Sequence, residues 1–142
     1  MILYLDTSAL VKLYVREEHS DQVREAVDNA AMVATHVIAY AEARAGFARA
    51  HRMGRIDDAG LQSLVQWLDE SWPGFDVITV DETLARRAGM LAEQFGLRGY
   101  DAVHLAAAEK LLIGAGNNRI RFACFDKSLS SAAAKLGMNA RL

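Results

Sequence analysis

The start of the chain constrains the fold most, because an apolar strand-like stretch runs directly into a polar turn. Residues 2–5 are Ile-Leu-Tyr-Leu, and Asp6, Thr7 and Ser8 follow them without a gap. An apolar helical pattern begins at once, so this stretch predicts a buried strand that turns directly into a helix. A strand that is apolar on both faces belongs in the middle of a parallel sheet. In such sheets ligands bind in the crevice where strands end and helices begin, and we expect Asp6 to lie there.

The rest of the chain alternates between strand-like and helix-like segments. Further strands are predicted at residues 32–35, 75–80 and 120–125, with a possible edge strand at 138–142. Helices are predicted at residues 8–15, 21–27 with Ser20 as its cap, 36–53, 58–71, 82–95, 100–113 and 128–136, and a turn at 114–118. This alternation predicts a three-layer α/β/α sandwich with a mainly parallel sheet of four or five strands.

Length and composition are those of one globular domain. The chain has 142 residues, of which 52% are hydrophobic, and one proline. We therefore expect a single domain over residues 1–142, with enough core to fold without disulfides. The sequence has no secretory leader pattern and no apolar run near the roughly 18 residues of a membrane span. A cytoplasmic location without membrane contact is the expectation.

The charge of the chain is informative in its distribution rather than its sum. The net charge is −2, which neither favours nor excludes a polyanionic partner. Basic side chains gather on the predicted helix 36–53 and just beyond it: Arg44, Arg49, His51, Arg52 and Arg55. An ordinary solvated helix face and a phosphate-contacting face both remain open for this group.

Three aspartates lie where strands end or helices begin. Asp6 and Asp126 each follow a predicted strand, and each has a serine two residues later, Ser8 and Ser128. Asp101 lies at the start of the predicted helix 100–113. Helix capping would explain each of the three taken alone, as it explains Asp57 and Asp81.

Glu42 does not fit that explanation. It lies too deep in the predicted helix 36–53 to cap it, although a position on a solvated face remains open. Gly46 follows one turn later, and a glycine inside a helix indicates close approach to another backbone. We therefore expect this face of the helix, with Glu42, to lie near the ends of the strands.

Convergence of these acids would call for a cation, because neighbouring carboxylates raise one another's pKa. Mg²⁺ or Mn²⁺ suits a site built from oxygen ligands. The four histidines are scattered, and His104 could either face the site or be a hydrogen-bonded core residue. Neither a glycine-rich phosphate loop nor a Gly-x-Ser-x-Gly elbow is present, so Ser8 is predicted to be an auxiliary polar group rather than a nucleophile.

Four segments of the sequence resemble the PIN-domain ribonucleases, and within them the VapC toxins of bacterial toxin–antitoxin pairs. These segments are YLDTSALVKLY, YAEARAGFARA, GYDAVHLAAA and FACFDKSLSSAAAKLGM, in the family's order from residue 4 to residue 138. The resemblance implies that the catalytic and metal-binding residues are Asp6, Glu42, Asp101 and Asp126, with Ser8 beside them.

The same resemblance implies an activity and partners. The expected activity is endonucleolytic cleavage of RNA by a water molecule that a bound Mg²⁺, or Mn²⁺, activates. Arg49 lies two helical turns after Glu42 on the same face and is predicted to contact an RNA phosphate. A cognate antitoxin is expected to cover the acidic pocket, and the family usually forms homodimers.

Two other functions remain open. A receiver-type signalling module also gathers acids around Mg²⁺, with Asp81 as the phosphoryl acceptor and Lys127 as its lysine. Such a module needs an acidic pair after its first strand, where this chain has Asp6 alone, and it leaves Glu42 and Asp101 unexplained. The third alternative is a binding protein without enzymatic activity. Phosphoryl uptake would indicate the receiver module, RNA cleavage would indicate the ribonuclease, and the absence of both would indicate the binding protein.

Overall fold

The computed structural model describes residues 1–116 and 119–142, and in these residues four strands form one parallel sheet. Their order across the sheet is β3-β2-β1-β4. The strands are β1 (Ile2–Leu5), β2 (Met32–His36), β3 (Asp76–Ile78) and β4 (Ile120–Ala123). Because β1 lies between β2 and β4, the predicted central place of the first strand is confirmed.

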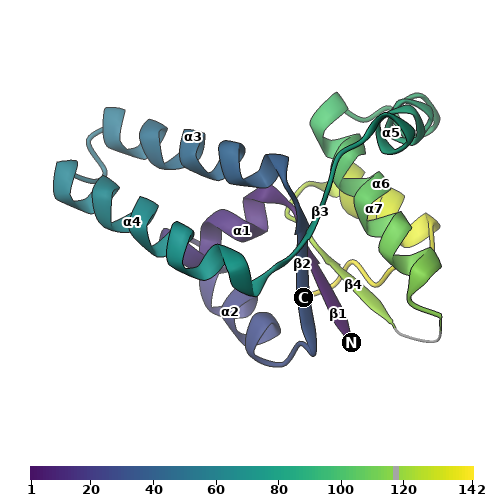
Figure 1. The fold of residues 1–142 in the computed structure, drawn as a ribbon, viewed down its shortest axis with the longest axis horizontal. Helices are drawn as coiled ribbons and strands as arrows, with labels where there is room; N and C mark the ends of the chain where they lie inside the picture. Colours follow the sequence, from purple (N-terminus) through teal and green to yellow (C-terminus); the bar gives the residue numbers. More distant parts are fainter. Residues whose placement is uncertain (117–118) are drawn as a thin grey trace.

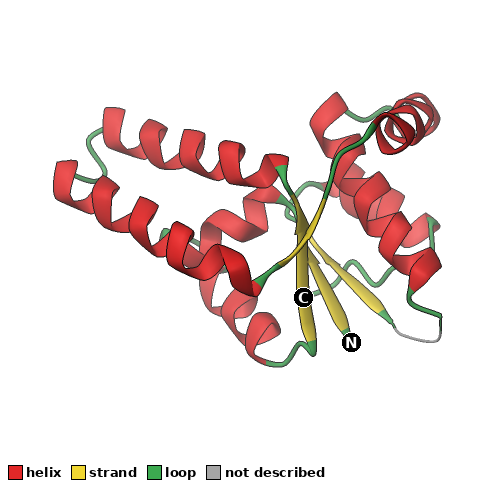
Figure 2. Cartoon of the chain, in the orientation of Figure 1, coloured by secondary structure: helices red, strands yellow, loops and turns green. Residues whose placement is uncertain are grey.

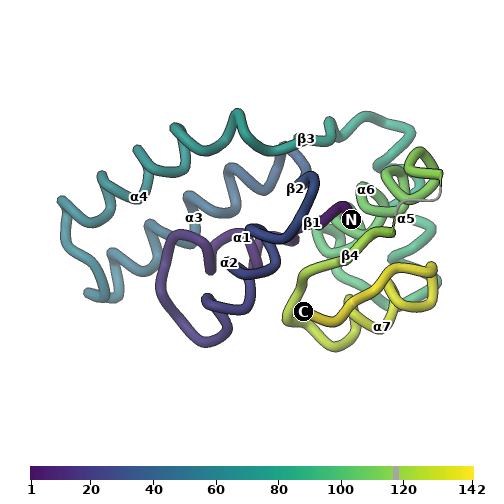
Figure 3. The backbone as a smooth tube through the Cα atoms, turned by 90° about the horizontal axis from the view of Figure 1, so that it is seen from below, coloured from purple at the N-terminus to yellow at the C-terminus, as the bar shows by residue number. Residues whose placement is uncertain are grey.

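Helices cover both faces of this sheet (Figures 1 and 2). One face carries α1 (Thr7–Tyr14), α2 (Ser20–Asp28), α3 (Ile38–Arg52) and α4 (Asp58–Ser71), and a short 3-10 turn, Trp72–Gly74, follows α4. The other face carries α5 (Glu82–Phe95), α6 (Gly99–Gly114) and α7 (Lys127–Lys135). The predicted three-layer α/β/α architecture is confirmed. The pair α3 and α4 extends well beyond the sheet, as both views show (Figures 1 and 3).

Alternation along β1 divides the core between the two faces. Leu3 and Leu5 pack with the helices of the α1–α4 face, whereas Tyr4 packs with Phe122 on the α5–α7 face. All four side chains have no solvent exposure. A strand buried on both sides cannot slip by one residue, because a slip would exchange its two faces. The position of Asp6 at the end of β1 is therefore fixed by the core.

Several local predictions are confirmed by the ends of the helices. Asp57 caps α4 and Asp81 caps α5, each accepting a backbone N–H three residues on, from Gly60 and Leu84 respectively. The glycine after α5, Gly96, adopts the left-handed conformation with φ 65° that ends many helices.

The predicted start of the long helix at residue 36 is wrong. Residue His36 ends β2, and α3 begins at Ile38. The reason is tertiary, because His36 pairs with Ile78 of β3 and the backbone N–H of Val37 donates to the Ile78 carbonyl at 2.9 Å. This pairing extends β2 by a residue and delays the helix.

Three smaller differences concern α2 and the C-terminal part of the chain. His19, with φ 69°, occupies the N-cap position of α2, and the predicted cap, Ser20, is its first helical residue. The predicted edge strand at 138–142 is reduced to one bridge between Arg121 and Asn139. The predicted turn at 114–118 includes two residues, 117 and 118, that lie outside the described part of the chain. Among the helices described, none is long and apolar enough to cross a membrane.

Candidate metal centre

All four acids singled out in the sequence line one pocket at the carboxyl edge of the sheet. The pocket has a volume of about 280 Å³. Its lining consists of Asp6, Thr7, Ser8, Glu42, Arg98, Asp101, His104, Phe125 and Asp126. Asp6, Glu42 and Asp126 lie in segments that follow β1, β2 and β4, which the parallel sheet brings to the same edge, whereas Asp101 comes from the start of α6.

Asp6 is held by one of its two carboxylate oxygens. Its Oδ1 accepts hydrogen bonds from the Ser8 hydroxyl at 2.7 Å and from the Ala9 backbone N–H at 2.8 Å, and the second bond caps α1. Asp6 is only 5% exposed. Burial raises the pKa of this carboxyl although the bonds from Ser8 and Ala9 act against the rise. In residues 1–116 and 119–142, Oδ2 accepts no hydrogen bond and is free for a ligand.

Asp126 repeats this arrangement at the end of the neighbouring strand. Its Oδ1 accepts the Leu129 backbone N–H at 2.8 Å and so caps α7. The cap uses one carboxylate oxygen, so the same side chain can cap the helix and present its other oxygen to the pocket. Asp6 and Asp126 therefore both cap a helix and line the pocket.

Asp101 lies in the first turn of α6 without capping it. Arg98 occupies the N-cap position, and its Nε lies 3.7 Å from Asp101 Oδ2. Burial raises the pKa of Asp101, and the charges of Asp126 and Glu42 raise it further against the opposing effect of Arg98. Asp6 and Asp101 thus both hold a proton more readily than an ordinary aspartate, and a positive charge in the pocket would oppose this effect.

Glu42 reaches the pocket from α3 and is held by two donors. The Thr7 hydroxyl donates to Glu42 Oε1 at 2.8 Å, and His104 Nε2 lies 3.2 Å from the same oxygen. Burial acts to raise the pKa of Glu42, but these two hydrogen bonds outweigh burial and the pKa falls below its ordinary value. Glu42 is therefore held ionised.

The prediction that Gly46 marks a close approach of its helix to another backbone is wrong. The nearest atom to a Cβ built on Gly46 would be Cγ2 of Val11 at 3.6 Å. That is an ordinary van der Waals distance to a side chain of α1. Glu42 reaches the pocket because α3 begins beside β2, not because its glycine permits close packing.

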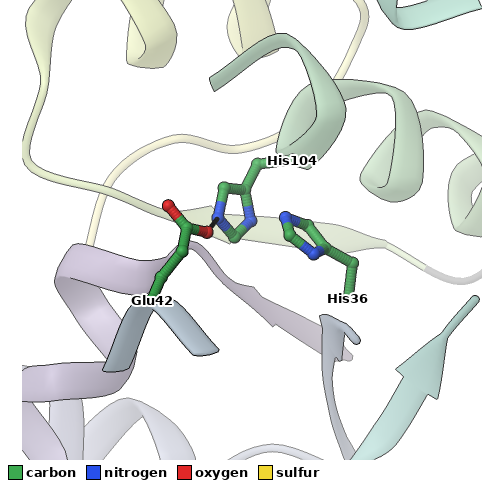
Figure 4. A group of neighbouring side chains, drawn as sticks. All are labelled: His36, Glu42 and His104. Carbon is green, nitrogen blue, oxygen red and sulfur yellow. Dashed lines mark hydrogen bonds and ion pairs between the residues drawn. The ribbon is translucent and has the colours of Figure 1, made fainter. Parts of the chain in front are cut away.

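A second group of possible ligands combines Glu42 with two histidines, His36 and His104 (Figure 4). Each of His36, Glu42 and His104 has one potential metal-ligand atom, and these three atoms lie within 4.8 Å of one another. Distance alone would allow a metal ion between them. The hydrogen bonds of His36 argue against it.

His36 lacks a lone pair where a metal would need one. Its Nδ1 accepts the Ile38 backbone N–H at 3.0 Å, so the proton of the neutral ring is on Nε2. Burial lowers the pKa of this ring to about 3. A metal on Nε2 would move the proton to Nδ1, where it would face the N–H of Ile38, whereas histidine ligands normally donate this proton to an acceptor. The oxygen-rich pocket of the four acids fits a divalent cation, and a hard ion such as Mg²⁺ or Mn²⁺, better than the histidine pair does.

The pocket also contains residues that sequence reasoning missed. Thr7, Arg98 and Phe125 line it. Their only signal in the sequence is proximity, since Thr7 follows Asp6, Arg98 precedes Asp101 by three and Phe125 precedes Asp126. Arg49, the predicted phosphate contact, is exposed on α3 and is not among the lining residues. Asp81 and Lys127, required by the receiver alternative, do not line the pocket either.

Two kinds of sequence comparison, with a family model and with individual known proteins, find similar proteins along most of the chain. The family model described as "PIN domain" matches residues 3–135. Ribonuclease VapC45 of Mycobacterium tuberculosis is 30% identical over 136 residues, which cover 96% of this chain and 92% of that protein. Ribonuclease VapC46 of the same species is 33% identical over 136 residues, covering 96% and 93% respectively.

Solved structures share the fold at lower sequence identity. FitAcB from Neisseria gonorrhoeae has a TM-score of 0.70 at 22% identity, covering 94% of each chain. A toxin–antitoxin complex from Klebsiella pneumoniae has a TM-score of 0.62 at 18% identity, covering 87% of this chain and 86% of that one. The family match and the VapC relatives show that the chain belongs to the PIN-domain family, in its VapC group.

Proposed function

We propose that this protein is a metal-dependent endoribonuclease and the toxin of a toxin–antitoxin pair. The observation that carries the proposal is the convergence of Asp6, Glu42, Asp101 and Asp126 on one pocket. The names of the relatives, VapC ribonucleases, support the same activity. The four acids would hold Mg²⁺ or Mn²⁺, and when bound such an ion supplies charge neutralisation at the phosphate and a lowered pKa for a water molecule.

The side chains have separate roles in this proposal. Asp6 and Asp126 present their free Oδ2 atoms while capping keeps the other oxygen in place. Glu42 is held ionised by its donors, and Asp101 contributes a charge at the mouth of the pocket, with its side chain 29% exposed. Ser8 acts as an auxiliary polar group by orienting Asp6 through its hydroxyl.

An adjoining cleft supports RNA as the substrate. A cleft of about 750 Å³ between α5 and α6 shares Glu42, Arg98 and Asp101 with the acidic pocket. The Arg98 side chain is 86% exposed and is suited to a phosphate contact, with Arg49 as a second proposed contact farther along α3. Tyr100, 62% exposed, borders the cleft and offers a ring on which an unpaired base can stack.

A groove on α3 and α4 supports an antitoxin partner. It has a volume of about 1040 Å³, and its apolar lining includes Ala45, Ala48, Leu61 and Val65. An amphipathic helix buries its apolar face in grooves of this kind. Replacing Val65 by Asp should weaken antitoxin binding and leave RNA cleavage unchanged, whereas unchanged antitoxin affinity would exclude this groove. A homodimer, usual in the family, remains part of the proposal.

Cleavage of a mixed RNA pool by the purified protein tests the proposed activity. We expect discrete fragments with Mg²⁺ or Mn²⁺, none with chelator, and a rate reduced by roughly two orders of magnitude in Asp101→Asn. Asp81→Asn is the matched control, because asparagine can keep the cap of α5 and the residue lies outside the pocket. Equal cleavage by wild type and Asp101→Asn would contradict the proposal. Phosphoryl uptake from a small donor, lost in Asp81→Asn, would favour the receiver alternative.

A further inference from the structure

We propose that His104 is a positioning residue that sets the metal affinity of the acidic pocket by holding Glu42 in place. This inference rests on the proposed metal site and deepens it. His104 lies on α6 one turn after Asp101 and is 2% exposed. Its ring contacts both the core of the sheet and the pocket, so it is a core residue and a site residue together.

The ring of His104 has a partner at each nitrogen. Nδ1 lies 3.0 Å from the Tyr4 hydroxyl oxygen, and Nε2 lies 3.0 Å from Thr7 Oγ1 and 3.2 Å from Glu42 Oε1. Figure 4 shows the side of the ring that faces Glu42. These contacts join residues from β1, α1, α3 and α6.

One arrangement of protons satisfies every group in this network. Thr7 donates its proton to Glu42 Oε1, so Thr7 Oγ1 can accept another one. The Tyr4 hydroxyl has Nδ1 of His104 as its hydrogen-bond partner at 3.0 Å, so it donates its proton there. The ring proton is then on Nε2, where it is donated to Glu42 and Thr7. A carboxylate can only accept, so a donor at this position is the complement that Glu42 requires.

The network anchors Glu42 Oε1 to the core of the sheet. Tyr4 is fully buried and stacks on Phe122 with ring centroids 5.3 Å apart and planes within 8°. Its hydroxyl fixes the ring of His104, which in turn fixes Oε1. In the described residues Oε2 accepts no hydrogen bond, and Glu42 lines the pocket. Outer partners that orient a metal ligand in this way typically contribute 10- to 100-fold in metal affinity.

Mn²⁺ affinity of the full-length protein, measured by calorimetry without RNA, tests the inference. His104→Asn and His104→Gln are matched polar variants that differ in where they carry a donor. The glutamine amide reaches the place of Nε2 beside Glu42, whereas the asparagine amide lies near Nδ1 beside Tyr4. We expect His104→Asn to lower Mn²⁺ affinity by about 10- to 100-fold and His104→Gln to stay within about threefold of wild type.

Two further variants separate positioning from loss of stability and from loss of the site itself. Tyr14→Phe removes a hydroxyl bonded to Ser71 on the other face of the sheet, and should lower stability with no change in Mn²⁺ affinity. Glu42→Gln should weaken Mn²⁺ binding at least as much as His104→Asn. Wild-type affinity in His104→Asn, alongside loss in Glu42→Gln, would overturn the positioning role alone. Equal losses in His104→Asn and His104→Gln would overturn it as well. Unchanged affinity in Glu42→Gln would overturn the metal site together with this inference.

Discussion

His36 is a buried histidine whose neutral form the fold requires. Its side chain has no solvent exposure, its Nδ1 accepts the first free N–H of α3, and its ring lies 3.9 Å from that of His104, centroid to centroid. Nε2 has no hydrogen-bond partner in the described part of the chain. Burial, with a smaller effect of the neighbouring His104, lowers the pKa of the ring to about 3, and a proton on Nδ1 would in addition break the bond to Ile38.

This histidine should make the protein less stable in mild acid. The folded-state pKa of about 3 lies below the ordinary value of 6.5, so between these values the unfolded chain binds a proton that the folded chain lacks. The contribution of His36 is therefore present above pH 6.5 and is lost as the pH falls towards 3. Between pH 7 and pH 5 we expect wild type to lose roughly 2 kcal/mol more than His36→Asn, which keeps an acceptor for Ile38 but does not titrate.

Urea denaturation in chelator at the two pH values measures this difference. Parallel losses in wild type and His36→Asn would mean that His36 titrates normally in the folded protein.

At the scale of elements, two helices that begin beside the pocket, α1 and α7, are capped by acids that also line it. Asp6 and Asp126 cap α1 and α7 through Oδ1 and line the pocket. The cap fixes the side chain before any cation arrives, so the site is preorganised by helix formation itself. A substitution at such a position affects both the helix and the pocket. Replacement by asparagine separates the two effects, because its amide can keep the cap but carries no charge.

Asp126→Asn and Asp126→Ala should differ in stability but not in metal binding. Asparagine caps a helix about as well as aspartate, whereas alanine costs about 1 kcal/mol. In chelator we expect Asp126→Asn to unfold near the wild-type urea midpoint and Asp126→Ala to unfold earlier by about that free energy, while both weaken Mn²⁺ binding. Equal destabilisation by the two variants would show that the cap contributes little.

The helix caps could be predicted from the sequence because they follow local rules. Asp57, Asp81 and Gly96 act on backbone groups within a few residues of themselves. The start of α3 could not, because it depends on the pairing of His36 with Ile78 on a distant strand, β3. The role of His104 was equally hidden, since its partners Tyr4 and Glu42 are 100 and 62 residues distant.

At the scale of the whole molecule, the sheet order brings the acids together at some cost to stability. The strands β2, β1 and β4 are neighbours, so the segments that follow them meet at one edge. Burial raises the pKa of Asp6 and Asp101, and a group with a raised folded-state pKa stabilises the fold only in acid and loses that contribution as the pH rises through its folded-state value. At neutral pH the site without a cation is therefore a source of instability that a bound cation would relieve.

Mn²⁺ should stabilise the folded protein at pH 7. At about 100 times the dissociation constant, a ligand that binds only the folded state adds about 2.7 kcal/mol to the free energy of unfolding. This gain should shrink towards pH 4, where protons compete for Asp6 and Asp101, and it should be largely absent in Asp101→Asn. Denaturation with and without Mn²⁺ measures it. An equal gain in wild type and Asp101→Asn would mean that Mn²⁺ binds elsewhere.

The position of a bound ion tests the central claim most directly. Crystals grown with Mn²⁺ should give an anomalous diffraction peak in the pocket lined by Asp6, Glu42, Asp101 and Asp126, within coordination distance of their oxygens. A peak between the rings of His36 and His104 would contradict the assignment of the site. A peak remote from all four acids would contradict the account of this pocket as a metal centre.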